Sequence, residues 1–158
     1  MASSTAMQRQ RRKLRFQSSE EFLAEAERLA AGPYRLLGNW TYGQILDHLA
    51  RGINNFYEGF GFQAPWHIRT IVKLFLKQRI LTRGMTPGIQ LPKSAASLLP
   101  ATEVSTAEGL ARLRAAVERL SREDPVQPHP FFGRLTPEEI RQLMLRHGEL
   151  HLGFVIPE

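Results

Sequence analysis

The stretch TPEEIRQLMLRHGELHLGFV, residues 136–155, contains the clearest start of a helix in the chain. Thr136 suits the capping position and Pro137 the first helical position, and Glu139 stands where a capping box places its acidic partner. The stretch therefore predicts a helix over residues 137–153.

Four other segments carry the same kind of signal, with capping residues followed by apolar residues every three or four positions. They lie at about 19–31, 42–60, 65–83 and 105–121. Residues 84–104 contain three prolines and no clear period, so they are predicted as a long loop. Period-two patterns typical of strands are scarce.

These five helices predict an all-α fold. The simplest packing is an antiparallel four-helix bundle formed by the first, second, fourth and fifth helices, with the third helix (65–83) lying across it as an insertion. At 158 residues the chain is long enough for one domain and too short to expect two. We assign residues 1–17 to a basic N-terminal tail and residues 18–158 to a single helical domain.

Composition excludes several classes of protein. There is no cysteine, so disulfides, thiolate metal ligands and a cysteine nucleophile are absent. No stretch approaches the roughly 20 apolar residues that span a bilayer, and the basic N-terminus is not followed by the apolar run of a secretory signal. A cytoplasmic location is the expectation.

His147 and His151 lie four residues apart in the last predicted helix. Because an α-helix turns about 100° per residue, the two side chains leave the same face one turn apart, as a bidentate metal site requires. Ile140 and Met144 share this face, which directs the pair toward the core. Buried neutral histidines need partners for their ring nitrogens, and one divalent cation would satisfy both.

The pair differs from the helix motif of zinc proteases, which has a glutamate directly after the first histidine. Gly148 occupies that place here. Glu149 lies about 200° around the helix from His147 and is expected to face away. Protease chemistry is therefore not supported.

His48 is the best candidate for a third ligand, because it lies in the middle of the predicted helix 42–60. This helix carries an inward polar stripe of Gln44, His48, Arg51 and Asn55. Gln44 and Asn55 are interpreted as residues that orient a ligand or contact a substrate, and Arg51 as a group for an anion. Three imidazoles would leave a coordination position open for water or substrate, as in catalytic sites.

The competing interpretation is a non-catalytic interaction protein, since histidines four apart also arise by chance. The helix 65–83 is basic and amphipathic, with Arg69, Lys73 and Lys77 four apart. Such a helix can lie on an anionic membrane or meet an acidic partner, but a solvated charged face is favoured, so membrane contact is not expected. This interpretation predicts no metal and an exposed apolar and basic face around Val72 and Lys73.

The other histidines and the aromatic residues near the second helix are interpreted as structural. His67 is expected to be exposed, and His129 to stabilise a turn, although it could cover the site as part of a loop. Trp40 and Tyr42 are expected to pack rather than to stack on a ligand. No nucleic-acid-binding module accompanies the basic tail, so specific nucleic acid is not an expected partner. A homodimer is considered, without a defined interface.

Three segments resemble the DinB/YfiT-like superfamily, and within it the branch called domain of unknown function 1569. They are LGNWTYGQILDHLA (37–50), HPFFGRLTPEEIRQLMLRHGELHLGFV (129–155), and RRKLRF (11–16) followed by EEFLAEAERLAAG (20–32). The resemblance covers nearly the whole chain. It reproduces together a Trp and His separated by seven residues, a His-Pro-x-x-Gly motif and a His-x-x-x-His motif.

The resemblance implies a four-helix bundle that holds a divalent metal, commonly zinc or nickel, through three histidines. By position these are His48, His147 and His151. Characterised members of the superfamily include metal-dependent transferases that join a low-molecular-weight thiol to an electrophile, and a thiol-dependent isomerase. The resemblance thus implies a metal-dependent transferase or hydrolase acting on a small-molecule substrate, in which the metal binds the thiol cosubstrate as thiolate.

Overall fold

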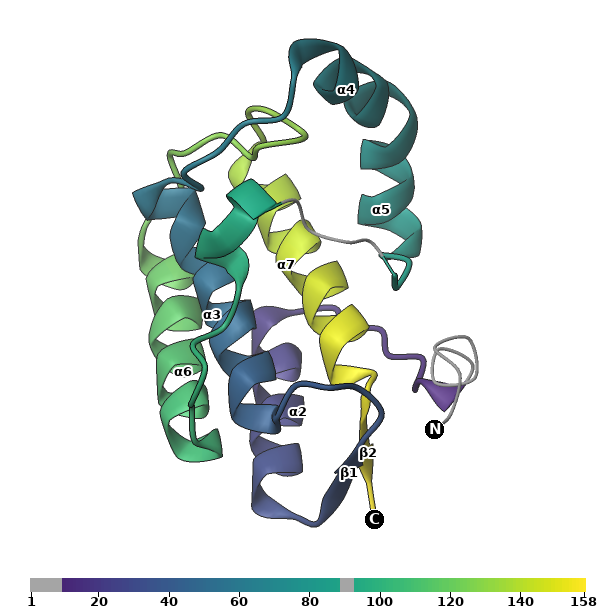
Figure 1. Ribbon diagram of the computed structural model, residues 1–158, viewed down its shortest axis with the longest axis vertical. Coiled ribbons are helices and arrows are strands. Elements are labelled where there is room, and N and C mark those ends of the chain that lie inside the picture. Colours follow the sequence, from purple (N-terminus) through teal and green to yellow (C-terminus); the bar gives the residue numbers. More distant parts are fainter. Residues whose placement is uncertain (1–9, 89–92) are drawn as a thin grey trace.

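A computed structural model describes residues 10–88 and 93–158 (Figure 1). The protein is mostly helical, with one small antiparallel pair of strands. The helices are α2 (Ser19–Ala31), α3 (Tyr42–Glu58), α4 (Trp66–Ile71), α5 (Lys77–Arg83), α6 (Thr106–Arg122) and α7 (Pro137–Leu152). A π-helix, η1 (Val72–Leu76), joins α4 to α5, and a 3-10 helix, η2 (Lys93–Leu98), precedes α6. All five segments predicted as helices are helical.

The helices begin where the sequence places their caps. The side chains of Thr41, Ser105 and Thr136 each accept a hydrogen bond from the backbone N–H three residues later. In each case the side chain of that later residue, a Gln or Glu, accepts a hydrogen bond from the backbone N–H of the capping residue. These capping boxes satisfy N–H groups that have no partner inside a helix. The starts of α3, α6 and α7 are therefore fixed by local sequence.

Four helices, α2, α3, α6 and α7, pack around the core (Figure 1). The helices α3 and α6 approach most closely, because glycines stand at their crossing. A Cβ added to Gly43 would lie 2.1 Å from the carbonyl oxygen of Val104, and one added to Gly109 would lie 2.5 Å from that of Gly43. Fully buried side chains such as Phe22, Leu46 and Leu113 fill the interior.

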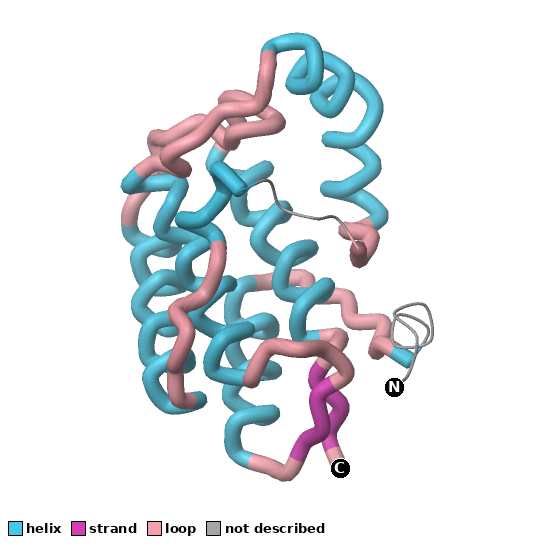
Figure 2. Tube along the Cα trace, viewed as in Figure 1, coloured by secondary structure: helices cyan, strands magenta, loops and turns pink. Residues whose placement is uncertain are grey.

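The strands β1 (Tyr34–Leu36) and β2 (Val155–Pro157) pair antiparallel, with Leu36 opposite Val155 (Figure 2). This pair corrects the expectation of an all-α fold. Each strand has three residues, too few to produce a recognisable period-two pattern in the sequence. The pairing fastens the segment after α7 to the connection between α2 and α3.

The described part of the predicted basic tail is packed on the domain. Arg12 donates through its backbone N–H to the carbonyl of Gly153 (2.9 Å) and through Nε to that of Val155 (2.9 Å). Its guanidinium also pairs with Glu25, and Phe16 is buried. Arg12 therefore serves as a structural anchor for the segment that follows α7.

The segments α4, η1 and α5 form an arm beside the core helices (Figure 1). Only its second half is anchored firmly: α5 lies along α7, Leu81 is buried, and Lys77 forms an ion pair with Glu139 at the start of α7. Trp66, Leu74 and Phe75 on the first half expose 76%, 68% and 72% of their surfaces. The apolar side of this predicted helix is thus largely uncovered.

Candidate metal centre

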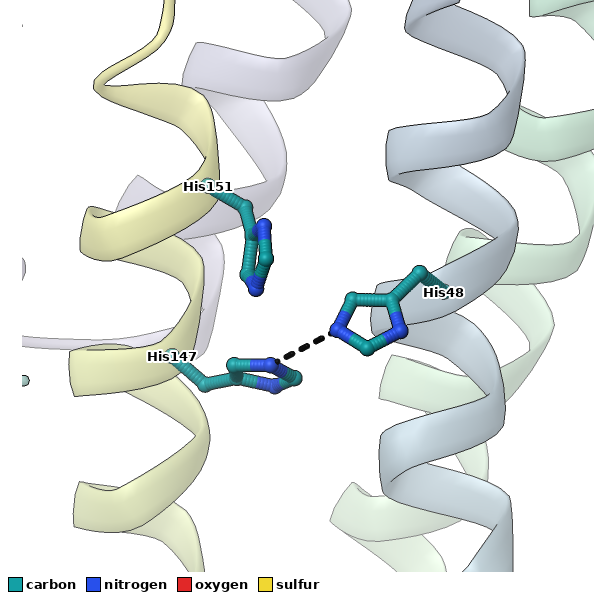
Figure 3. Close-up of side chains that lie close together, drawn as sticks. All are labelled: His48, His147 and His151. Carbon is teal, nitrogen blue, oxygen red and sulfur yellow. Dashed lines mark hydrogen bonds between the residues drawn. The ribbon is translucent and has the colours of Figure 1, made fainter. Parts of the chain in front are cut away.

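Three histidines meet between α3 and α7. His48 projects from α3, and His147 and His151 project from successive turns of α7, so that their rings converge (Figure 3). One ring nitrogen from each lies within 4.8 Å of the others, which is a group that could hold a metal ion. The two histidines of the C-terminal helix and the third from the neighbouring helix are brought together as the sequence predicted.

The proton on His48 is located by a backbone carbonyl. Its Nδ1 lies 2.5 Å from the carbonyl oxygen of Leu98, which can only accept a hydrogen bond, so Nδ1 donates. In the neutral ring Nε2 then carries a lone pair, and it lies 3.0 Å from Nε2 of His147. A backbone acceptor on the far nitrogen is the usual support of a metal-binding histidine.

Burial keeps the cluster uncharged. Desolvation lowers the pKa of His48, and it lowers the pKa values of His147 and His151 well below their ordinary value. The neighbouring rings reinforce the effect on His147. Neutral imidazoles offer lone pairs to a cation, whereas imidazolium rings would repel it.

The separation of two of the three rings also suits a divalent ion. Two nitrogens bound to one zinc ion in tetrahedral geometry lie about 3.3 Å apart, and the Nε2 atoms of His48 and His147 are separated by 3.0 Å. Gly52 on α3 provides the room, because a Cβ there would lie 3.3 Å from the His147 ring. The donor set is all imidazole, which suits transition metals such as zinc, copper, iron and nickel better than magnesium or calcium.

Trp40 forms one wall of the cluster. Its ring is nearly parallel to that of His151, with centroids 5.8 Å apart, and its centroid lies 4.9 Å from that of His48. Trp40 therefore packs, as expected, but against the histidines themselves. Tyr42 also packs: it is buried, and its hydroxyl donates to the carbonyl of Ala26.

The other residues of the polar stripe on α3 do not gather around the three histidines. Gln44 accepts from the N–H of Thr41 and donates to the carbonyls of Ala101 and Thr102. Arg51 and Asn55 instead line a separate polar cavity of about 410 Å³ beside η2, the 3-10 helix that ends at Leu98. The buried amide Nδ2 of Asn55 has no hydrogen-bond partner among the described residues.

Asp47 was not among the site residues predicted from the sequence. This buried carboxylate binds Arg51 (2.8 Å), Arg112 (2.7 Å) and the backbone N–H of Ala101 (2.9 Å). Despite burial, these three donors together hold its pKa below the ordinary value. The bond to Ala101 fixes the loop three residues after the carbonyl that holds His48. An acidic residue inside an otherwise apolar stretch of helix was the available signal.

We expect Asp47→Ala to lower the free energy of unfolding by about 2–3 kcal/mol, because hydrogen bonds to a charged group are lost. Chemical denaturation at neutral pH measures this change. Asp124→Ala is the matched control: Asp124 is largely exposed, 4.0 Å from Arg141, and its loss should cost less than about 0.5 kcal/mol. Equal effects of the two changes would contradict the assigned role of Asp47.

His129 lies outside the cluster and stabilises a turn, as predicted. Its Nδ1 accepts hydrogen bonds from the N–H groups of Phe131 and Phe132, and its ring stacks on that of Phe132. Burial lowers its pKa to about 3. The remaining histidine, His67, is exposed on α4, also as predicted.

The depressed pKa of His129 predicts a loss of stability in mild acid. In the unfolded chain this histidine has a pKa near 6.5, whereas in the folded protein its pKa is about 3. Between these two pH values the unfolded chain therefore binds one more proton than the folded protein. This residue alone should remove about 2 kcal/mol of stability between pH 7 and pH 5. His129→Asn keeps an acceptor near Nδ1 without titrating. The pH dependence of unfolding should therefore be shallower in the variant, and identical slopes would contradict the assignment.

Comparison with known proteins gives a family but no activity. A family model described as "Protein of unknown function (DUF1569)" matches residues 8–158, which include all three histidines of the cluster. No curated protein and no solved structure matches the chain.

Proposed function

Because the chain belongs to the DUF1569 family, whose function is unknown, we propose its function from the three-histidine cluster. The proposed function is that of a DinB-like metalloenzyme. It binds zinc or nickel through His48, His147 and His151 and activates a small thiol or water toward a small-molecule electrophile. The observation that carries this proposal is the convergence of three imidazole rings, with the His48 proton held away from the cluster by Leu98.

The arrangement of the helices supports the DinB-like part of the proposal. Two core helices supply the three ligands, and the other two complete a packed group of four. We therefore propose that α2, α3, α6 and α7 correspond to the antiparallel bundle of that superfamily. The arm and the loop after it are additions to this bundle.

A metal bound to three imidazoles would lower the pKa of a thiol or water in its open position, producing a nucleophile near neutral pH. The chain has no cysteine, so the sulfur of a thiol reaction must come from a cosubstrate. Trp40 would keep water away from one side of the histidines.

The residues of the polar stripe on α3 are given two roles, binding of the substrate and support of the loop that follows η2. We propose that Arg51 and Asn55 bind the polar part of the substrate in their cavity, where the Asn55 amide can donate. Gln44 would act indirectly, by holding the loop that follows η2, whose last residue, Leu98, binds His48 through its carbonyl. Asn55→Asp should then raise the KM for a substrate that accepts this bond.

Cobalt substitution tests the proposal directly. Co²⁺ added to metal-free protein should give visible d–d absorption, and 2-mercaptoethanol should then add a sulfur-to-cobalt charge-transfer band. Since the chain contains no sulfur ligand of the cysteine type, a thiolate band can arise only from the added thiol. Both signals should be lost in His151→Ala and kept in His67→Ala, which removes an exposed histidine.

The outcomes separate the parts of the proposal. Cobalt binding without a thiolate band would reject thiol activation and leave activation of water. Absence of cobalt binding, or equal binding by His151→Ala, would reject the metal site. A thiolate band in the parent protein would direct the search for activity to thiols paired with electrophiles.

A further inference from the structure

The first half of the arm presents an uncovered apolar face. Six large apolar side chains between residues 66 and 76 each expose at least 38% of their surface. They are Trp66, Ile68, Ile71, Leu74, Phe75 and Leu76. Apart from this group, only Leu99 and Val126 are comparably exposed among the large apolar side chains in the described part of the chain. Apolar patches of this kind mark interaction surfaces.

The surroundings of this face are basic. Residues 59–102 contain six basic residues and no acidic one. Lys73, Arg79 and Arg83 are exposed on the arm, whereas Lys77 is engaged with Glu139. The partner should therefore offer both an apolar phase and negative charge.

The position of the arm leaves this face accessible. The helix α4 stands at the end of the molecule opposite β1 and β2, and the arm arches away from α3 and α6 before α5 returns along α7 (Figures 1 and 2). A flat surface could reach α4 and η1 without first meeting α3 or α6.

Contrary to the expectation from sequence that this helix makes no membrane contact, we propose that the face formed by residues 66–76 docks on the surface of an anionic lipid bilayer. Tryptophan and phenylalanine partition into the interfacial region, leucine and isoleucine into the acyl boundary, and lysine and arginine pair with anionic headgroups. None of the helices in the described part of the chain is long and apolar enough to cross a membrane.

A second copy of the chain fits this face less well. In a two-fold symmetric dimer the same surface of both copies meets, so each residue lies close to the same residue, or to a neighbour of that residue, in the other copy. It would gather Lys73 and Arg79 of both copies around the buried patch, with no acidic residue of the arm to compensate. An anionic bilayer removes this repulsion and covers the same apolar side chains.

Two of the arginines before α2 are engaged with other parts of the protein. Arg12 is bonded to Val155 and Glu25, and Arg15 donates to the carbonyl of Thr82. The arm is therefore the part to test.

The test is sedimentation of the full chain with vesicles of phosphatidylcholine mixed with phosphatidylglycerol, beside vesicles of phosphatidylcholine alone. Binding should require the anionic lipid and weaken with salt. The emission of Trp66 should shift to shorter wavelength on binding, and Trp66→Phe should remove that shift while leaving the signal of Trp40, the other tryptophan.

Two pairs of substitutions separate the apolar and charged contributions. Leu74→Gln with Phe75→Gln should weaken binding by at least roughly 30-fold, since two large apolar contacts are lost. Lys73→Glu with Arg79→Glu should weaken it by at least roughly 25-fold, about fivefold for each basic residue. Val126→Gln and Arg35→Glu are matched controls at exposed positions outside the arm and should bind as the parent does.

Absence of binding to anionic vesicles, or undiminished binding by the Leu74 and Phe75 variant, would overturn the proposal. Analytical ultracentrifugation without lipid provides the alternative outcome. A dimer that the same variant dissociates, in a protein that ignores vesicles, would assign the face to a second copy of the chain. Because all the altered residues are exposed, loss of folding does not obscure either result.

Discussion

Protein purified without chelator is expected to contain close to one equivalent of a divalent metal, and His147→Ala is expected to contain almost none. His147 is the decisive position because it shares α7 with His151 and its Nε2 lies 3.0 Å from that of His48. Removing it leaves two ligands on different helices. We expect the metal affinity to fall by more than about 100-fold, beyond the effect of losing a residue that only orients a ligand.

Elemental analysis measures the metal content, and thermal unfolding gives an independent signal. At a free zinc concentration 100 times the dissociation constant, binding should stabilise the parent by about 2.7 kcal/mol and leave the variant unchanged. His67→Ala should retain both the metal and the stabilisation. Metal absent from the parent even after reconstitution with zinc or nickel would reject the proposed enzyme and leave the arm as the remaining functional surface.

Gly148→Ala is expected to lower the free energy of unfolding by about 2–3 kcal/mol, although alanine normally favours a helix over glycine by about 1 kcal/mol. A Cβ at this position would lie 2.5 Å from Cε2 of the buried Phe22 ring. The larger change Gly148→Glu, which would complete the zinc-protease motif, should prevent folding. Phe22 therefore explains why this helix carries glycine between His147 and Glu149.

Chemical denaturation of a double-mutant cycle tests the contact. Phe22→Leu alone should destabilise the protein, but Gly148→Ala should cost less in that background than in the parent, because the smaller side chain makes room. Gly38→Ala is the control, since a Cβ there meets nothing within 4 Å. Strictly additive effects of Phe22→Leu and Gly148→Ala would contradict the proposed clash.

The features that could be predicted from sequence are those set by residues close together in the chain. Capping boxes located the starts of three helices, and the four-residue spacing of His147 and His151 placed both on one face. Burial of His48 in the middle of α3 brought the third ring to them. The first two follow from helix geometry, whereas the meeting of His48 with the other two histidines also depends on the packing of α3 against α7.

The features that could not be predicted depend on which distant segment covers which face. The competing interpretation predicted an exposed apolar and basic face around Val72 and Lys73, but the sequence alone could not decide whether a distant segment covers the apolar side of this helix. Likewise, the donors to Asp47 come from Arg51, Arg112 and the loop at Ala101, so its role appears only once these are assembled. The β1–β2 pair is too short to have a pattern of its own.

The hydrogen bond from His48 to the Leu98 carbonyl couples metal binding to the order of η2 and of the loop that follows it. If metal binding favours the ring orientation that this carbonyl supports, occupancy must favour the ordered loop, and by linkage the ordered loop must raise the metal affinity by the same factor. Amide hydrogen exchange at Ala101, whose N–H is held by Asp47, would report that reciprocal gain in protection. A substitution far from the histidines that loosens this loop would then appear as weaker metal binding.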